Sequence, residues 1–337
     1  MSNSQIPYAG YGPPLHTVYS APPVQPEEAP KKELRRLSAA AGLSIIAFYI
    51  LQVAVFSVIE LLGLTDAYND NLLFQNSIGS VISIVCLFGP FFAAMLLMKK
   101  QQRRILDCFG KPFAKSLLWL AVPAGFAVCM AGNIATGWFI TLVQGAGVTL
   151  TAPEGAVPGD PAGIAFYIVQ IAVVPALIEE FALRGVVMQP LRRYGDTFAV
   201  VASAVIFALM HGNLIQAPFA LIAGIGLGYF VISTGSIWTG VIIHFLNNLF
   251  SVIISVVQSN TGQSVDFAYT LTLSVSLVLG LGCVVAYRFA GSRYRFRQSV
   301  PPLRLGRKTA AFAFTVPMVI AAGLIVWTMH YYVSFGG

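Results

Sequence analysis

The sequence IAFYIVQIAVVPALIEEFALRGVVMQP, residues 164–190, is an apolar stretch that carries two adjacent carboxylates, Glu179 and Glu180, with Arg184 one helical turn further on. At ~1.5 Å per residue, such a stretch is long enough to cross the ~30 Å hydrocarbon core of a bilayer. An ionised carboxylate near the bilayer centre costs at least ~2.5 to 3.5 kcal/mol, so two neighbouring ones need partners or a function. The pair is therefore the first candidate for a functional site.

Long apolar runs recur along the whole chain of 337 residues, of which 57% are hydrophobic and 10% are charged. This composition is typical of a polytopic membrane protein. Because helices satisfy their backbone hydrogen bonds within each span, we predict an all-α transmembrane helix bundle of eight to nine spans that encloses a polar cavity. The nine candidate spans are residues 38–63, 78–98, 117–146, 164–191, 198–211, 217–233, 237–257, 267–289 and 310–333.

The same pattern divides the chain into four parts. Residues 1–37 begin with a Pro-rich segment that lacks the cationic and apolar regions of a signal peptide, so we predict a disordered cytosolic tail. Residues 38–146 supply N-terminal transmembrane helices, residues 164–257 supply the core with the carboxylates, and residues 267–337 supply C-terminal transmembrane helices.

Cysteine spacing and charge exclude two further classes of protein. The cysteines lie singly, without CxxC spacing, which indicates packing residues and neither a disulfide framework nor a metal cluster: Cys86, Cys108, Cys129 and Cys283. The net charge of +7 comes without an aromatic-interleaved basic patch, so we expect no nucleic-acid binding.

The distribution of Lys and Arg follows the positive-inside rule. The outer loops, near residues 64–77, 147–163 and 258–266, contain acidic charges and no Lys or Arg. We therefore predict a multi-pass plasma-membrane protein with a cytosolic N-terminus and some attraction to anionic lipid. With nine spans, every basic residue except Arg184 is cytosolic: Lys31, Lys32, Arg35, Arg36, Lys99, Lys100, Arg103, Arg104, Lys111, Lys115, Arg192, Arg193 and seven more from Arg288 to Lys308.

Spans five and six, residues 198–211 and 217–233, are shorter than the roughly 20 residues that a crossing helix needs. Between them lies HGNLIQAP, residues 211–218, a turn-like segment at membrane depth. Irregular backbone at that depth is tolerated only where protein or a water-filled cavity covers it. This segment is the reason for predicting a cavity.

Several polar side chains reach the middle of the membrane. Counted at ~1.5 Å per residue from the cytosolic end of each span, the depths are ~18 Å for Glu179, ~20 Å for His211, ~10 Å for His244 and ~17 Å for Asn248. Residues four apart share a helix face, which pairs Glu180 with Arg184, Phe207 with His211, and His244 with Asn248.

These residues also have structural interpretations. A carboxylate that an Arg neutralises can serve a purely structural ion pair. A lone His or Asn in a transmembrane helix often forms an interhelical hydrogen bond. Asn247 lies on a different face from Asn248, and we interpret it as such a packing residue. Two of the four histidines, His211 and His244, fall at depths comparable with the only mid-membrane carboxylates, and this coincidence favours function.

A carboxylate, two imidazoles and an amide in a buried wet site are the groups needed to add water to a carbonyl. If Arg184 holds Glu180 ionised, Glu179 is the candidate general base, and His244 with Asn248 are candidate donors to the oxyanion. The chain lacks GxSxG and HExxH, so neither a serine hydrolase nor that class of zinc protease is indicated.

Three blocks in order resemble the motifs of the CPBP family of intramembrane proteases, named for CAAX prenyl proteases and bacteriocin-processing enzymes. EEFALR (179–184) is similar to its EExxxR, FALMH (207–211) to its FxxxH, and HFLNN (244–248) to its HxxxN. The resemblance covers residues 164–255. It implies that Glu179 activates water, that Glu180 and Arg184 support it, that His211 helps to hold the water, and that His244 and Asn248 form the oxyanion site.

The sequence leaves the metal question open. Glu179, His211 and His244 are three ligands of the kinds that a catalytic divalent metal such as zinc uses, and the family is often labelled as metalloprotease. The competing mechanism needs no metal, because a Glu and a His can activate water directly.

The predicted function is hydrolysis of a peptide bond in a membrane-embedded or lipidated, CAAX-like substrate within the lipid bilayer. A catalytically silent immunity or scaffold protein is the alternative, although all motif residues are present. A proton-coupled transporter is disfavoured, because it should show internal repeats, and the polar cluster of spans four to seven has no counterpart in the first three spans. Substrate identity and oligomeric state do not follow from the sequence.

Overall fold

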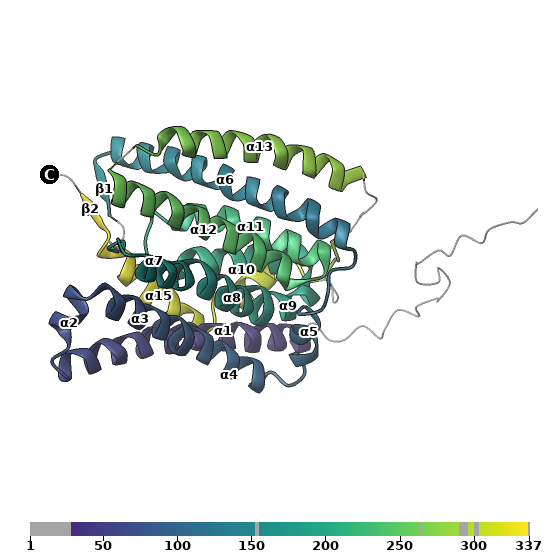
Figure 1. Cartoon of the computed structure of the whole chain (residues 1–337). Helices are drawn as coiled ribbons and strands as arrows, with labels where there is room; N and C mark the ends of the chain where they lie inside the picture. Colours follow the sequence, from purple (N-terminus) through teal and green to yellow (C-terminus); the bar gives the residue numbers. More distant parts are fainter. Residues whose placement is uncertain (1–27, 152–154, 263, 290–295, 300–302, 336–337) are drawn as a thin grey trace, which may run out of the picture.

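The computed structural model describes residues 28–151, 155–262, 264–289, 296–299 and 303–335. The described residues form a bundle of helices with one small sheet (Figure 1).

Helix α1 begins at Glu28, so residues 28–37, which we predicted as part of the tail, are helical. The start of α1 carries charged residues that bind other elements at the end of the bundle, and such contacts favour a helix over a free tail. Residues 1–27 of the predicted tail lie outside the described residues.

The helices are described in chain order, with π-helical segments η1 to η3 and one 3₁₀ turn, η4. The elements are α1 (Glu28–Leu61), α2 (Thr65–Asp70), α3 (Leu72–Val81), η1 (Ile82–Phe88), α4 (Gly89–Leu97), α5 (Gln102–Asp107), α6 (Lys115–Gly145), β1 (Val148–Leu150), α7 (Pro161–Ile168), η2 (Val169–Val173), α8 (Val174–Glu180), η3 (Phe181–Met188), α9 (Gln189–Leu191), η4 (Arg192–Tyr194), α10 (Asp196–Met210), α11 (Ala217–Thr234), α12 (Ile237–Thr261), α13 (Asp266–Phe289), α14 (Leu305–Ala313), α15 (Val316–His330) and β2 (Val333–Phe335).

Among the described residues, seven helices are long and apolar enough to cross a membrane, or eight if the bent pair α14 and α15 is one span. The protein is therefore an all-α polytopic membrane protein. The predicted bundle of eight to nine spans is confirmed at its lower number, and two of the nine candidate spans are not straight, full-length helices. Helix α10, with 15 residues, is too short to pass the same test, and α14 and α15 meet at 72° in place of one straight span over 310–333. Pro317, in the first turn of α15, has no N–H to continue the preceding helix.

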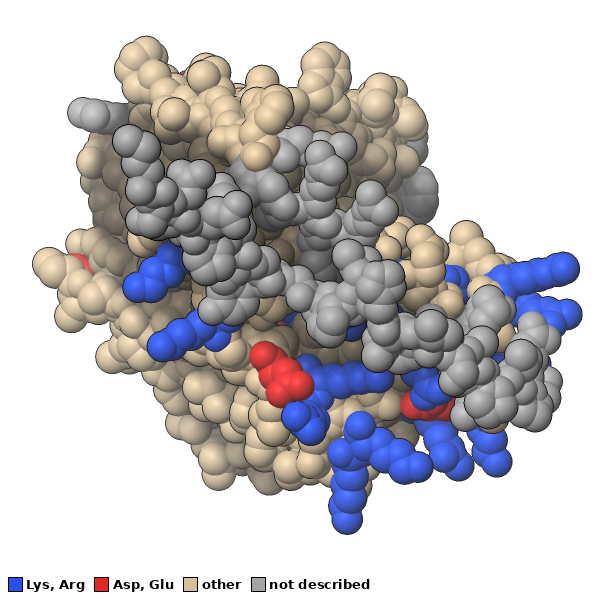
Figure 2. All heavy atoms as spheres, turned by 90° about the vertical axis from the view of Figure 1, so that its right-hand side faces the viewer, with Lys and Arg blue, Asp and Glu red and all other residues tan. Residues whose placement is uncertain are grey.

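Lys and Arg side chains gather at one end of the bundle, the face shown in Figure 2. At this end the start of α1 is tied to two other elements, because Glu33 forms an ion pair with Arg193 and accepts a hydrogen bond from Gln101. Strands β1 and β2 pair in antiparallel register at the opposite end (Figure 1). We call these the basic end and the sheet end. The sheet was not predicted from the sequence.

Exposed aromatic side chains mark both ends of the bundle. Tyr and Trp are enriched where a helix leaves the hydrocarbon for the headgroups. Exposed Trp and Tyr side chains lie near the basic end at Trp119 and Trp238, and near the sheet end at Trp138, Trp327 and Tyr331. This arrangement agrees with a bundle that spans the membrane from one end to the other.

The segment between α10 and α11 is irregular, as predicted. Gly212 has φ +67°, a conformation that L side chains rarely adopt, and Asn213 is fully buried and hydrogen-bonds to His211 and Gln216 within the turn. A Cβ atom at Gly212 would lie 3.1 Å from the Thr328 side chain, so α15 covers this backbone. The polar cavity that we expected beside it stays a prediction.

Candidate functional site

Glu179 and Glu180 end the short helix α8, which lies between the π-helical segments η2 and η3. Arg184 follows in η3. π-Helical turns are rare and are frequently found at functional sites. The spans that flank the carboxylates were predicted as helical, but these π-helical turns were not.

Glu180 is completely buried and forms an ion pair with Arg184, whose Nη1 lies 3.2 Å from Oε1. Arg184 is also completely buried, donates a long 3.5 Å hydrogen bond to the carbonyl oxygen of Gly224, and places its guanidinium 4.5 Å from the centre of the Phe207 ring. A guanidinium over an aromatic face is attracted by the ring quadrupole. The expected Glu180–Arg184 pair is therefore present.

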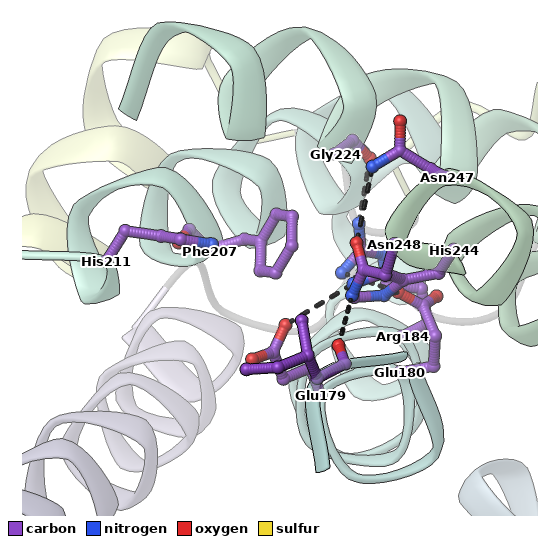
Figure 3. Close-up of polar contacts among 10 residues, drawn as sticks. Glu179, Glu180, Arg184, Phe207, His211, Gly224, His244, Asn247 and Asn248 are labelled. Atoms are coloured by element: carbon purple, nitrogen blue, oxygen red, sulfur yellow. Dashed lines mark hydrogen bonds and ion pairs between the residues drawn. The ribbon is translucent and has the colours of Figure 1, made fainter. Parts of the chain in front are cut away.

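His244 lies between the two carboxylates (Figure 3). Its Nδ1 is 3.1 Å from Oε1 of Glu180, and its Nε2 is 3.7 Å from Oε2 of Glu179. A carboxylate paired with Arg184 only accepts hydrogen bonds, so Nδ1 of His244 carries the proton and Nε2 faces Glu179. The Glu179 side chain keeps 24% of its surface exposed and makes no closer polar contact among those found in the described residues.

His211 lies apart from the carboxylates, on the far side of Phe207 in Figure 3. Its Nδ1 contacts the carbonyl oxygen of Phe207 at 2.8 Å, and its ring packs edge-to-face on Phe207 at 4.9 Å between centroids. The ring of Phe207 also packs against His244, at 5.8 Å. Phe207 thus separates the two histidines.

This separation bears on the predicted metal ligands. Among the described residues, no group of three or more His, Cys, Asp and Glu side chains is placed to hold a metal ion. Glu179 and His244 face each other, but His211 does not join them, so the three residues do not fit a three-ligand zinc site in this arrangement.

Asn248 is held by two hydrogen bonds. Its Nδ2 donates to the carbonyl oxygen of Ile171 at 3.1 Å, and its Oδ1 accepts from Nδ2 of Asn247 at 3.2 Å. Ile171 is four residues before Pro175, which has no N–H to give to that carbonyl in a regular helix. Asn248 therefore reaches the backbone of the same span that carries Glu179.

Three residues around the site were not predicted from the sequence as parts of it. Pro175 and Gly240 are the first two, and Asn247, interpreted as a packing residue, is the third. Pro175 follows Ile171 by four residues, and Gly240 precedes His244 by four. The i to i+4 rule that paired the motif residues also places Gly240 on the face of His244, so that spacing was a usable signal.

Gly240 gives a testable consequence. A Cβ atom at this position would lie 2.5 Å from Oε2 of Glu180, because α12 passes directly over the buried carboxylate. We expect Gly240→Ala to move Glu180 away from His244 and to lower both the unfolding temperature and any activity. Thermal unfolding in detergent measures the first effect. Gly282→Ala, where a Cβ atom meets nothing within 4 Å, is the matched control on α13 and should not lower the unfolding temperature, because alanine favours a helix interior over glycine.

Residues 161–250 match one family model, described as type II CAAX prenyl endopeptidase Rce1-like. This segment is similar to that family. The matched residues run from α7 into α12 and contain every residue of the site described above. The CPBP resemblance is confirmed for this segment, and the matched family is one of proteases, which supports a hydrolase. No curated protein and no solved structure matches the chain.

Proposed function

We propose that the protein is an intramembrane endopeptidase that uses Glu179 to activate water against a peptide bond of a membrane-embedded or lipidated, CAAX-like substrate. One observation carries the proposal. Within the Rce1-like segment, Arg184 and His244 hold the buried Glu180, while its neighbour Glu179 stays partly exposed and faces Nε2 of His244. The two adjacent carboxylates therefore have different environments, one structural and one open to a reactant.

The proposed reaction begins with a water molecule beside Glu179. Glu179 takes one proton from the water while the water oxygen bonds to the carbonyl carbon of the substrate, and the carbonyl oxygen becomes an oxyanion. The carbon–nitrogen bond then breaks, and Glu179 returns the proton to the leaving amine. The 3.7 Å between Glu179 and Nε2 of His244 is longer than a direct hydrogen bond, so this pair is a suitable place for the water to bind.

The oxyanion is assigned to Asn248. A carboxamide nitrogen has two N–H donors, and the carbonyl of Ile171 takes one of them, which leaves one for the substrate. His244 donates to an oxyanion only when its ring is charged, because Nδ1–H is directed to Glu180. The proposed role of His211 in holding the water requires its ring to move past Phe207, with which it now packs.

The proposed substrate reaches the site through the lipid or from the basic end. We propose that the basic end faces the cytosol and that the membrane is the plasma membrane, which places the N-terminus in the cytosol. The matched family is one of CAAX prenyl endopeptidases. A prenylated C-terminal peptide is thus one member of the substrate class, beside other lipidated peptides and membrane-anchored proteins.

The test is cleavage by the purified full-length protein of a panel of farnesylated and transmembrane peptides, with and without a strong chelator. We expect cleavage of at least one lipidated peptide by wild type. Because the three candidate ligands are not assembled, we expect the chelator to change the rate less than twofold. Loss of cleavage in chelator, with recovery on added zinc, would instead assign the water to a metal. Absence of cleavage across the panel would favour a non-catalytic immunity or scaffold protein.

A further inference from the structure

We infer that Asn247 is a positioning residue that fixes the carboxamide of Asn248, together with the carbonyl oxygen of Ile171, four residues before Pro175. The inference rests on the proposed function for its catalytic meaning, because Asn248 is the proposed oxyanion donor. The geometry itself is independent of that function.

The first contact comes from the neighbouring residue on α12. Nδ2 of Asn247 donates to Oδ1 of Asn248 at 3.2 Å. This bond fixes which side of the Asn248 carboxamide is oxygen, since an amide turned by 180° would place two N–H donors against each other. The Asn247 side chain therefore orients the Asn248 carboxamide, although the two residues lie on different faces of the helix.

The second contact comes from η2. Nδ2 of Asn248 donates to the carbonyl oxygen of Ile171 at 3.1 Å. In a regular helix this carbonyl accepts from the N–H of the residue four positions later, but that residue is Pro175, which has none. The proline ring also crowds the carbonyl of residue i−4, which turns it away from the helix axis. Pro175 thereby removes the donor that a regular α-helix would offer to the carbonyl that accepts from Asn248.

The two contacts hold the amide at both ends and leave one N–H of Asn248 for a reactant. Turning the amide would break both hydrogen bonds, so the free N–H keeps one direction. Catalysis by an oxyanion donor depends on such preorganisation, because a donor that must turn during the reaction loses much of its advantage.

A packing role for Asn247 explains its burial poorly. Only 5% of its surface is exposed, and its Oδ1 has no hydrogen-bond partner among the described residues. A buried polar atom without a partner is costly, so an apolar side chain would pack better at this position. The hydrogen bond that the Asn247 side chain donates to Asn248 explains why an amide occupies this buried position.

The direct test observes the Asn248 side-chain amide by NMR of the full chain in detergent micelles, with ¹⁵N-labelled asparagine. Asn248→Ala identifies the signal by its loss. We expect Asn247→Leu to shift this signal and to raise its hydrogen-exchange rate at least tenfold. Pro175→Ala, which restores a competing N–H, provides a second variant and should shift the same signal. Asn260→Leu, near the sheet end of α12, should leave it unchanged.

An unchanged Asn248 signal in Asn247→Leu would overturn the inference. The kinetic readout is a double-mutant cycle on a cleaved peptide. Asn247→Leu should lower kcat roughly tenfold with little change in KM, and should cause no further loss in the Asn248→Ala background. Equal losses in both backgrounds would show a merely structural role. If wild type cleaves no peptide while the NMR result holds, the proposed function fails and the positioning stands.

Discussion

Replacing Glu179 by glutamine is expected to lower kcat on any cleaved peptide by about 10³-fold while the protein folds and inserts as before. Glutamine has the size of glutamate but takes no proton, so the water beside it stays un-ionised. Folding is expected to persist because Glu179 keeps 24% of its side chain exposed and its nearest charged contact, to His244, is 3.7 Å long. Single-turnover cleavage and thermal unfolding in the same detergent measure the two effects, and Glu179→Ala should likewise abolish cleavage.

Glu60→Gln is the matched control for this prediction. Glu60 lies in the last turn of α1, exposed and outside the site, so the same chemical change there should alter neither kcat nor the unfolding temperature. Normal turnover by Glu179→Gln would remove the proposed mechanism. A large loss of stability in Glu179→Gln would show instead that this carboxylate is a structural partner of His244.

Much of the site could be predicted because spacing along one helix determines which residues share a face. That rule paired Glu180 with Arg184, and the structure shows their ion pair. It also placed Phe207 and His211 together, and their rings are in contact. These contacts join residues four apart along one continuous stretch of helical backbone, where the local geometry decides the neighbours.

Contacts between helices could not be predicted in this way. Spacing gives no information on the rotation of one helix about its axis relative to another. The sequence therefore assigned both His211 and His244 to one cluster, whereas the structure places His244 between the carboxylates and His211 beyond Phe207. The roles predicted for these residues, and the domain boundaries, stay predictions.

The spans were predictable from apolar length, and their interruptions were less so. The break between α14 and α15 is short, and the apolar run continues across it, so hydropathy alone reads one span. The pairing of β1 with β2 joins residues more than 180 positions apart, Val148 with Phe335. Local sequence patterns do not predict a contact over that separation. Pro175 was visible in the sequence, but its effect depends on the Asn248 side chain on a neighbouring helix.

Arg184→Met is expected to destabilise the protein by about 3 to 5 kcal/mol, because it leaves the buried carboxylate of Glu180 without its cation. Methionine keeps most of the apolar stem, so the loss is mainly electrostatic. The remaining partner, His244, contacts Glu180 through one nitrogen at 3.1 Å and is shared with Glu179. Unfolding in a graded series of SDS and mild detergent mixtures measures the change in the free energy of unfolding.

Arg193→Met is the matched control, since its ion pair with Glu33 is about one-third exposed and such pairs contribute about 0 to 1 kcal/mol. The double variant Glu180→Gln/Arg184→Met should recover part of the lost stability, because removing both charges leaves no uncompensated ion in the core. Wild-type stability in Arg184→Met alone would contradict the assignment of Glu180 as the held carboxylate. It would also remove the reason for choosing Glu179 as the base, since the two carboxylates would then no longer differ in their need for a cation.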